Sequence, residues 1–297
     1  MTAPTDYANI QALIGKISRA AMLADVFDVA DARRQYRAAV LLLHPDRCPL
    51  PEAAVALRRL NELKEAFEKG GNLEDDAGPF RMGQRQAHFS GNQELLEASY
   101  GNYLRLKSRN SPAALHFQRY LPEAMALSAG KLAATFPLRA LPLSGLSLPQ
   151  EHVNWILSRL LEACAWLSQE GFVHGGISPE SVFVVPETHG IILGSFYHTA
   201  FRDGMVRTVS ARYRHWYPPG LFKSKRADTA TDLELCKRTA AYLLGDRSGL
   251  GVRLLKTHNK AFVDFLLARH SDAYQCYDEY RGLLKRTFDN KFHPLTL

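Results

Sequence analysis

Two loops of the sequence carry polar side chains whose types and spacing suit recognition or catalysis. In the first, a proline separates His44 from Asp46. Because proline has no N–H group and restricts the residue before it, we expect a helix to end here and Asp46 to accept backbone N–H groups or to meet a partner as an anion. In the second loop, His174 precedes Ser178 and Ser181. A hydrolase uses such hydroxyl and imidazole groups, but no GxSxG turn and no evident Asp partner accompany them, so we do not predict one.

Helices must position the first loop, because apolar residues recur at helical spacing on both sides of it. One set lies before residue 22, a second ends at Leu43, and a third lies between residues 52 and 67. Asp31 is a candidate N-cap for the second helix. The apolar positions are Ile10, Leu13, Ile17 and Ala21, then Tyr36, Val40 and Leu43, and then Val55, Leu57, Leu60, Leu63 and Phe67.

This arrangement resembles a J-domain over roughly residues 8–69, a family with a His-Pro-Asp loop between a basic helix and the following helix of a short antiparallel hairpin. Residues 24–29 resemble the family's segment before that hairpin, and 33–43 and 52–68 resemble its two helices. The resemblance implies stimulation of ATP hydrolysis by a DnaK-type chaperone ATPase. It implies His44, Pro45 and Asp46 as the signal, and Arg33, Arg34 and Arg37 as the basic docking face. The loop after Asp46 is short, and the alternative interpretation is a turn that only stops a helix.

The second loop follows a long predicted helix at 149–170 and precedes a predicted strand at 190–193. It resembles the catalytic loop of a protein kinase, and the resemblance extends over roughly residues 85–297. His174, Pro179 and the hydrophobic pair Val182 and Phe183 match the family pattern. The resemblance puts Gly176 at the carboxylate position, Ser178 at the lysine position, Ser181 at the asparagine position, and Gly194 (or Ser195, after a one-residue shift) at the magnesium-binding aspartate.

Phosphoryl transfer needs carboxylate and amide oxygens to hold magnesium and to orient the substrate, and glycine and serine do not supply the hard anionic oxygens that the ion requires. We therefore expect a pseudokinase. A predicted strand at 104–107 would carry Lys107 as the nucleotide lysine, with Glu123 on the next helix as its partner. Asp232 would be the structural aspartate of a later helix, and no GxGxxG loop is present. The alternative is an atypical ATP-dependent kinase or phosphotransferase with a rearranged active site.

An aromatic and basic cluster lies at residues 212–217. Aromatic rings among basic groups stack on nucleic acid, and in a kinase frame the same segment would contact protein. Both interpretations stay open for Tyr213, Trp216 and Tyr217 beside Arg212, Arg214 and His215. The histidines His174, His189 and His198 have no metal-ligand spacing, and the four cysteines form no CxxC pair, so we predict no metal site.

Composition limits the class of protein. The chain has 297 residues, 46% of them hydrophobic and 23% charged, with a net charge of +7 and a pI near 9.2. No dense Lys/Arg run appears, so we expect no nucleic-acid partner. The N-terminal residues lack a signal pattern, and no apolar run approaches the roughly 18 to 20 residues that span a bilayer. We therefore expect a cytoplasmic protein with no membrane partner.

The predicted fold class is multi-domain, with an all-α J-domain helical hairpin followed by an α+β two-lobed protein-kinase-like fold. The predicted boundaries are 1–70 for the J-domain, 71–84 for a Gly-, Asp- and Pro-rich linker, 85–145 for the N-lobe, built on a small antiparallel sheet, and 146–297 for the helical C-lobe. The predicted function is a co-chaperone without catalysis or cofactor. Its partners would be a DnaK-type chaperone ATPase and an unidentified client or scaffold protein.

Overall fold

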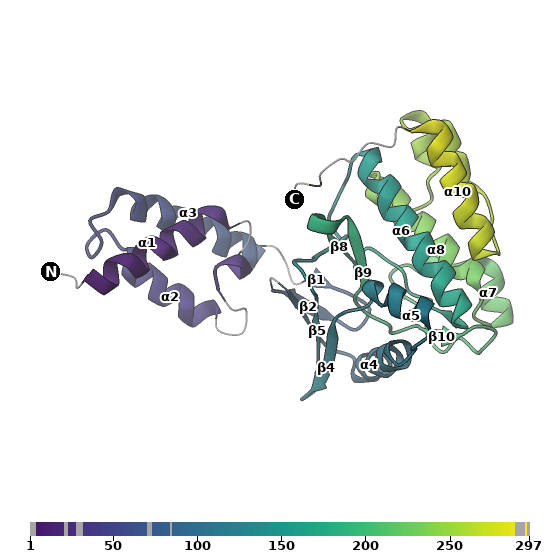
Figure 1. Ribbon diagram of the computed structural model, residues 1–297, viewed down its shortest axis with the longest axis horizontal. Helices are drawn as coiled ribbons and strands as arrows, with labels where there is room; N and C mark the ends of the chain where they lie inside the picture. The colour runs from purple at the N-terminus through teal and green to yellow at the C-terminus, as the bar shows by residue number, and fades with distance from the viewer. Residues whose placement is uncertain are drawn as a thin grey trace. The chain divides into compact units, whose positions relative to one another are not determined.

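The computed structural model describes residues 4–20, 23–27, 32–69, 73–83, 85–288 and 295. Helices and small antiparallel sheets both occur (Figure 1). The chain divides into two compact units, one made of residues 1–73 with 80–86 and the other of residues 74–79 with 87–297. The structure is thus of mixed α and β type with more than one compact unit.

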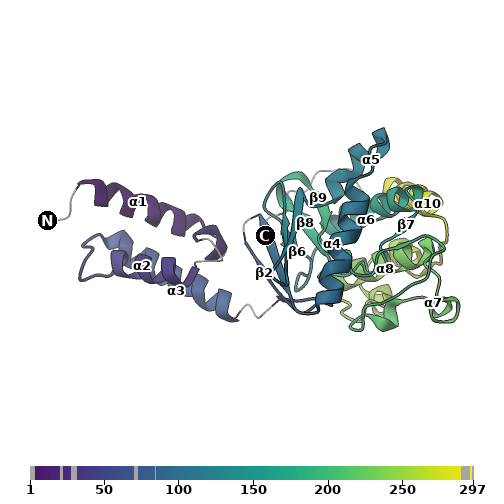
Figure 2. The ribbon, with the colours of Figure 1, turned by 90° about the horizontal axis from the view of Figure 1, so that it is seen from below.

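The helices of the first unit are α1 (Pro4–Arg19), α2 (Ala32–Leu43) and α3 (Pro51–Lys69), with the short 3-10 helix η1 (Leu23–Asp25) (Figure 2). Each long helix buries one apolar face, with Ile17, Leu43 and Leu60 fully buried in a shared core. Helices α1 and α3 both begin with a proline, Pro4 and Pro51. Proline suits the first position of a helix because the N–H that it lacks would have no intrahelical partner there. The helices expected at 33–43 and 52–68 are confirmed, whereas the proposed cap Asp31 lies outside the described residues.

Five short strands form a sheet in the order β1-β2-β3-β5-β4. Their bounds are β1 (Leu73–Glu74), β2 (Pro79–Met82), β3 (Gln86–Ser90), β4 (Ala124–Ser128) and β5 (Lys131–Thr135). In the segment 71–84, which the sequence predicts to be a linker, the described residues form β1, β2 and the turn between them. Phe80 and Met82 alternate with exposed neighbours and are buried, which is the pattern of a half-buried strand.

Residues 93–107 form helix α4 (Gln93–Lys107), where the sequence predicted a strand at 104–107. The side chain of Asn92 caps the helix by accepting the Leu95 N–H at 3.1 Å. Its inner face buries Leu96, Tyr103 and Leu106, at the spacing of a helix face. The strand expected at 104–107 and the helix expected to carry Glu123 are therefore wrong. Lys107 ends a helix, and Glu123 lies between the 3-10 helix η2 (Gln118–Tyr120) and β4.

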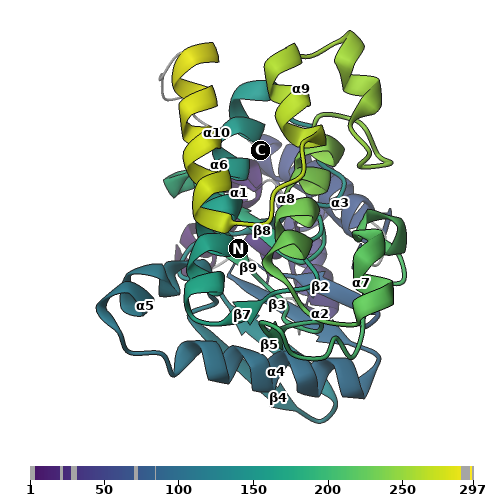
Figure 3. The ribbon, with the colours of Figure 1, turned by 90° about the vertical axis from the view of Figure 1, so that its right-hand side faces the viewer.

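The rest of the second unit is mainly helical, as expected. The long helix α6 (Gln150–Gln169) packs against α8 (Thr229–Leu243) and α10 (Ala273–Thr287) (Figure 3). The remaining helices are α5 (Pro112–Phe117), α7 (Pro219–Ser224) and α9 (Lys260–Leu267), with the 3-10 helices η3 (Pro186–Thr188), η4 (Arg214–Trp216) and η5 (Val252–Lys256). In the described part of the chain, no helix is both long and apolar enough to cross a membrane.

Two further small sheets position the second loop. One has the order β6-β8-β9, from β6 (Leu141–Pro142), β8 (Val182–Val185) and β9 (Gly190–Leu193), and the other pairs β7 (Phe172–Val173) with β10 (Ala200–Phe201). The hairpin of β8 and β9 aligns Val182 with Leu193. It therefore brings the end of the loop at 174–181 beside Gly194, whose N–H donates to the Ser181 carbonyl at 2.8 Å.

Candidate functional site

The His44-Pro45-Asp46 loop is exposed between α2 and α3. The side chains of His44 and Asp46 are 48% and 86% exposed, and their Nδ1 and Oδ2 atoms lie 3.4 Å apart. The backbone of the loop is fixed from within, because the N–H groups of Arg47 and Cys48 both donate to the His44 carbonyl at 2.8 Å. Cys48 is buried and anchors the loop to the helical core. The loop thus presents an imidazole and a carboxylate outward from an ordered turn.

Helix α2, which precedes this loop, exposes both charged and apolar side chains. Arg34 and Arg37 are exposed, whereas the side chain of Arg33 lies outside the described residues. Leu41 and Leu42 are also exposed, by 54% and 47%. Exposed leucines next to a charged loop add apolar area to a surface that otherwise attracts anions. The outer surface of α2 therefore combines two features of a protein docking surface.

The second loop is held by a carboxylate from α8. Asp232 accepts the backbone N–H groups of His174 at 2.7 Å and of Gly175 at 2.8 Å. Burial raises the pKa of Asp232 to about 7, against these two hydrogen bonds. Burial also lowers the pKa of His174 to about 3, so its ring is neutral. The loop is thus fixed at its start by a buried side chain, as a structural aspartate would fix it.

The two loop serines bind each other. The Ser178 N–H donates to the Ser181 hydroxyl at 2.9 Å, and the Ser181 N–H donates to the Ser178 hydroxyl at 3.2 Å. The Ser181 hydroxyl also donates to the Gly176 carbonyl at 2.8 Å. Both hydroxyl groups therefore stabilise the loop, and the neutral ring of His174 is no partner of theirs among the described contacts.

Glycine is required sterically at the two positions where the kinase resemblance expects carboxylates. A Cβ atom at Gly176 would lie 2.7 Å from Cδ2 of His198, and one at Gly194 would lie 2.1 Å from Cε2 of Phe183. Real Cβ atoms do not approach other heavy atoms so closely, and the Phe183 ring is fully buried. Side chains at these positions would need the surroundings to move.

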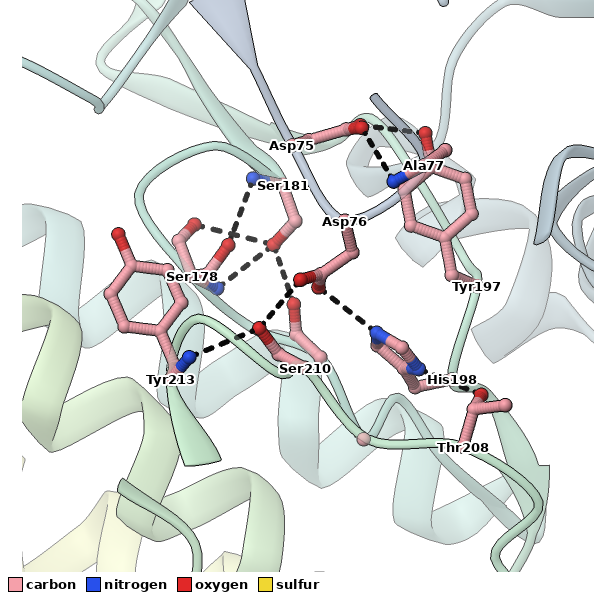
Figure 4. A network of polar contacts seen from close by, with 12 residues as sticks. Asp75, Asp76, Ala77, Ser178, Ser181, Tyr197, His198, Thr208, Ser210 and Tyr213 are labelled. Carbon is pink, nitrogen blue, oxygen red and sulfur yellow. Dashed lines mark hydrogen bonds and ion pairs between the residues drawn. The ribbon is translucent and has the colours of Figure 1, made fainter. Parts of the chain in front are cut away.

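A pair of carboxylates that the sequence analysis did not select lies at the turn between β1 and β2 (Figure 4). Asp75 accepts the Tyr197 hydroxyl at 2.6 Å and the N–H groups of Ala77 and Gly78 at 2.9 and 3.2 Å. Burial raises the pKa of Asp75 to about 6. The segment had been interpreted as a linker, and its adjacent carboxylates before a Gly-Pro step were the only sequence signal.

Asp76 joins the same turn to a second distant segment (Figure 4). Its Oδ2 lies 3.0 Å from Nε2 of His198, and its Oδ1 accepts the Ser210 hydroxyl at 2.7 Å. Burial opposes ionisation, but the hydrogen bonds from His198 and Ser210 leave the pKa of Asp76 below its usual value. The other ring nitrogen of His198, Nδ1, lies 2.8 Å from the Thr208 hydroxyl.

A cavity of about 860 Å³ opens between α4 and the segment 197–211. Its lining is both charged and apolar. Its lining residues include Asp76, Leu95, His198, Phe201, Arg207 and Thr208. Phe201 is 55% exposed, which is high for a large apolar side chain, so the cavity has an apolar rim.

No described contact joins Lys107 to the loop at 174–181. Its ammonium group donates to the Pro122 carbonyl at 3.4 Å, where burial lowers the pKa of Lys107 and the nearby Glu123 opposes that shift. The two residues are thus electrostatic neighbours, Lys107 at the end of α4 and Glu123 immediately before β4. Ser99 and Asn102, one turn apart on α4, instead contact the backbone of Phe196 at 2.8 and 3.0 Å.

The aromatic rings at 212–217, for which stacking on nucleic acid and contact with protein were both considered, do not form an exposed surface. Trp216 is fully buried, and Tyr213 and Tyr217 are almost so. The hydroxyl of Tyr213 donates to Glu180 at 2.9 Å, and Arg212 forms ion pairs with Glu180 and Glu74 at 3.6 and 3.4 Å. Rings that fill a core cannot stack on bases, so these residues tie their segment to the fold.

Among the described residues, no group of three or more His, Cys, Asp or Glu side chains is placed to hold a metal ion. Comparison of the chain with the models of known protein families finds no match. A search of curated proteins also finds no significant match. The functional argument therefore depends on the geometry described above.

Proposed function

We propose that this protein is a J-domain co-chaperone that stimulates a DnaK-type chaperone ATPase. The observation that carries the proposal is the exposure of His44 and Asp46 on an ordered turn between two antiparallel helices. Neither side chain belongs to the hydrophobic core of the helices, which forms around Leu43, Cys48 and Leu60. A specific tripeptide that the fold does not need is more simply explained by recognition than by packing.

The surface of α2 supports the same proposal. Transient protein contacts gain speed and orientation from rim charges around a few fixed central groups. Here Arg34 and Arg37 are exposed on the helix that ends at the loop, with Leu41 exposed one turn after Arg37. Such a surface suits an acidic partner surface with an apolar centre.

For the second unit, we propose a pseudokinase that binds a client or scaffold protein. Three features support a kinase-like frame. Asp232 on α8 holds the backbone of the loop at His174, the hairpin of β8 and β9 brings that loop beside Gly194, and α4 holds the backbone of Phe196 two residues later. These contacts join the segments that a kinase uses to build its site.

Loss of phosphoryl transfer is part of the proposal. Gly176 and Gly194 stand where carboxylates would orient substrate and magnesium, and their neighbours His198 and Phe183 fill the space that such side chains need. The hydroxyl groups of Ser178 and Ser181 each accept the backbone N–H of the other residue. The alternative, an atypical kinase, is favoured by one observation, which is that Asp76 brings a carboxylate to His198, the neighbour of Gly176.

The direct test is steady-state ATP hydrolysis by a DnaK-type chaperone in the presence of the whole protein. We expect stimulation by the wild type, and loss of it in Asp46→Asn, because the amide keeps the size of the side chain but removes its charge. Glu62→Gln is the matched control, since Glu62 is another exposed acid of the same helical unit, 56% exposed and paired with Arg59. It should stimulate as the wild type does.

Two outcomes would count against the proposal. Absence of stimulation by well-folded wild type, with cognate as well as generic partners, would reduce the tripeptide to a turn. Equal loss in Asp46→Asn and Glu62→Gln would indicate a general charge effect. Separately, thermal stabilisation of the protein by ATP with magnesium would favour the atypical kinase over the pseudokinase, because a ligand that binds the folded state raises its stability.

A further inference from the structure

Three side chains, one from the turn after β1 and two from the segment 197–211, form a relay (Figure 4) in the wall of the cavity. The carboxylate of Asp76 lies 3.0 Å from Nε2 of His198, and Nδ1 of the same ring lies 2.8 Å from the hydroxyl of Thr208. All three residues line the cavity. A carboxylate, an imidazole and a hydroxyl in this order are the parts of an activated nucleophile.

The hydrogen-bond pattern sets the tautomer that such a relay needs. Asp76 is ionised at neutral pH, because hydrogen bonds from His198 and Ser210 outweigh its burial. In the tautomer that donates its Nε2–H to Oδ2 of Asp76, the other ring nitrogen, Nδ1, is the acceptor. The Thr208 hydroxyl then donates to Nδ1. This is the direction of proton transfer that increases the nucleophilicity of the oxygen.

Of the three side chains in the relay, only that of Thr208, which carries the hydroxyl, is exposed. The side chain of His198 is 3% exposed and that of Asp76 is 16% exposed, whereas Thr208 is exposed. The hydroxyl is therefore the member of the relay that is most open to a substrate. Shielding from water keeps the imidazole and the carboxylate in one arrangement and strengthens their interaction.

We propose that Thr208 is the nucleophile of an acyl-transfer site and that its substrate is an activated ester or thioester with an apolar acyl group. Leu95 and Phe201 give the cavity apolar walls for the acyl chain, and Arg207, beside the nucleophile, gives it a positive charge for a developing oxyanion. The site is distinct from the co-chaperone function and does not depend on it.

In the first step, Oγ1 of Thr208 forms a bond to the acyl carbon while its proton passes to Nδ1 of His198. The bond from that carbon to the leaving group then breaks, and the leaving oxygen or sulfur takes the proton from Nδ1. Water or another acceptor removes the acyl group by the same two proton transfers in reverse order. Asp76 is a positioning residue, because it holds the ring and its tautomer without touching the substrate.

The protein contains its own control. Oγ1 of Thr257 lies 2.8 Å from Nδ1 of His258, so it repeats the hydroxyl and the imidazole at the same distance. This second pair is exposed, and no carboxylate contacts His258 among the described residues. A difference in reactivity between Thr208 and Thr257 in one sample would therefore measure what the carboxylate, the burial and the cavity add.

The experiment treats the whole protein with p-nitrophenyl acetate, follows nitrophenolate release, and locates acetyl groups by peptide mass spectrometry. We expect an initial burst and acetylation of Thr208 well ahead of Thr257. His198→Gln should lower the rate at Thr208 about 100-fold or more, because the amide still donates to Asp76 but cannot accept a proton. Thr208→Val should abolish the burst, and Thr208→Ser should retain it.

Two results would overturn the proposal. One is acetylation of Thr208 no faster than that of Thr257 in the wild type, a comparison that needs no variant to fold. The other is an unchanged rate in a folded His198→Gln protein. Either result would leave the relay as a structural contact between the turn after β1 and the segment 197–211.

Discussion

The carboxylate of Asp232, on α8, accepts the backbone N–H of His174, which lies 58 residues earlier in the chain, at 2.7 Å. The second oxygen accepts the N–H of Gly175. Both donors belong to a buried loop, where an unpaired backbone N–H destabilises the fold. One side chain thus fixes the backbone from which His174, Gly176, Ser178 and Ser181 project, so the shape of the loop depends on α8 as much as on its own sequence.

Replacement of Asp232 by alanine should therefore lower the free energy of unfolding by about 2 to 4 kcal/mol, because it leaves two buried donors unpaired. Asp232→Asn should lower it less, since the amide oxygen keeps one of the two acceptors. Urea unfolding followed by tryptophan fluorescence measures this effect in the second unit alone, because Trp155, Trp166 and Trp216 all lie there.

Asp228→Ala is the control for this measurement. Asp228 caps the same helix by accepting the Thr231 N–H at 2.9 Å, in a more exposed position. Loss of such a cap destabilises by about 1 kcal/mol. If both alanine variants lost the same amount, Asp232 would act only as a helix residue, and its role in holding the loop would be refuted.

Burial of Asp75 leads us to expect that the stability of the protein depends on pH. The unfolded chain loses this proton near pH 3.8 and the folded protein near pH 6, because burial raises the pKa of Asp75. Between these values the folded state binds more protons, so the free energy of unfolding falls as pH rises through the window and levels off above it. We expect Asp75 to contribute roughly 1 to 3 kcal/mol to this fall.

The measurement compares the wild type with Asp75→Asn from pH 4 to pH 7.5. The wild type should lose stability relative to the variant as pH rises, whereas Asp232 and other groups titrate in both proteins. For Asp76→Asn we expect the opposite change, in which the wild type gains stability relative to the variant as pH rises. The pKa of Asp76 is lowered in the fold, so its contribution is present at neutral pH and is lost on acidification. A pH-independent difference between wild type and Asp75→Asn would contradict the prediction.

Because the space around Gly194 is filled, we expect that a carboxylate introduced at this position does not create magnesium binding. In Gly194→Asp the new Cβ would meet the buried ring of Phe183, which itself packs on Phe136 at a centroid distance of 5.0 Å. We expect a loss of at least about 2 kcal/mol from overpacking. We also expect no gain in thermal stability with ATP and magnesium.

Gly194→Ala separates volume from charge and should destabilise comparably. Gly220→Asp is the neutral control, because no heavy atom lies within 4 Å of a Cβ at that position. A stable Gly194→Asp protein that gains stability with ATP and magnesium would instead support the atypical kinase.

Elements with a local signal were predictable from the sequence. Helical spacing of apolar residues, together with the proline after His44, predicted α2 and α3, and a long apolar pattern predicted α6. Helix α4 was missed, because Ser99 and Gly101 interrupt its pattern like a turn. Burial of its inner face and the cap at Asn92 outweigh those weak local preferences.

The candidate sites also differ in how far the sequence alone could predict them. The exposed loop at His44 is continuous in sequence, so its residues could be found together. The relay joins Asp76 to His198 across 122 residues, and only tertiary packing brings them together. Asp75 and Asp76 looked like linker residues because carboxylates beside glycine and proline are typical of exposed turns. The partners that bury them, Tyr197 and His198, have no signal near them in the sequence.

Helix α3 ends at Lys69 and strand β1 begins at Leu73, so three residues of the sequence separate them. Each residue of a chain spans at most about 3.6 Å. If the hairpin recruits a chaperone ATPase and the second unit retains a client, their presence in one chain with so short a separation makes the meeting of the two bound proteins intramolecular. The effective concentration of one at the other would then be on the order of millimolar, far above what two separate proteins of modest affinity reach in solution.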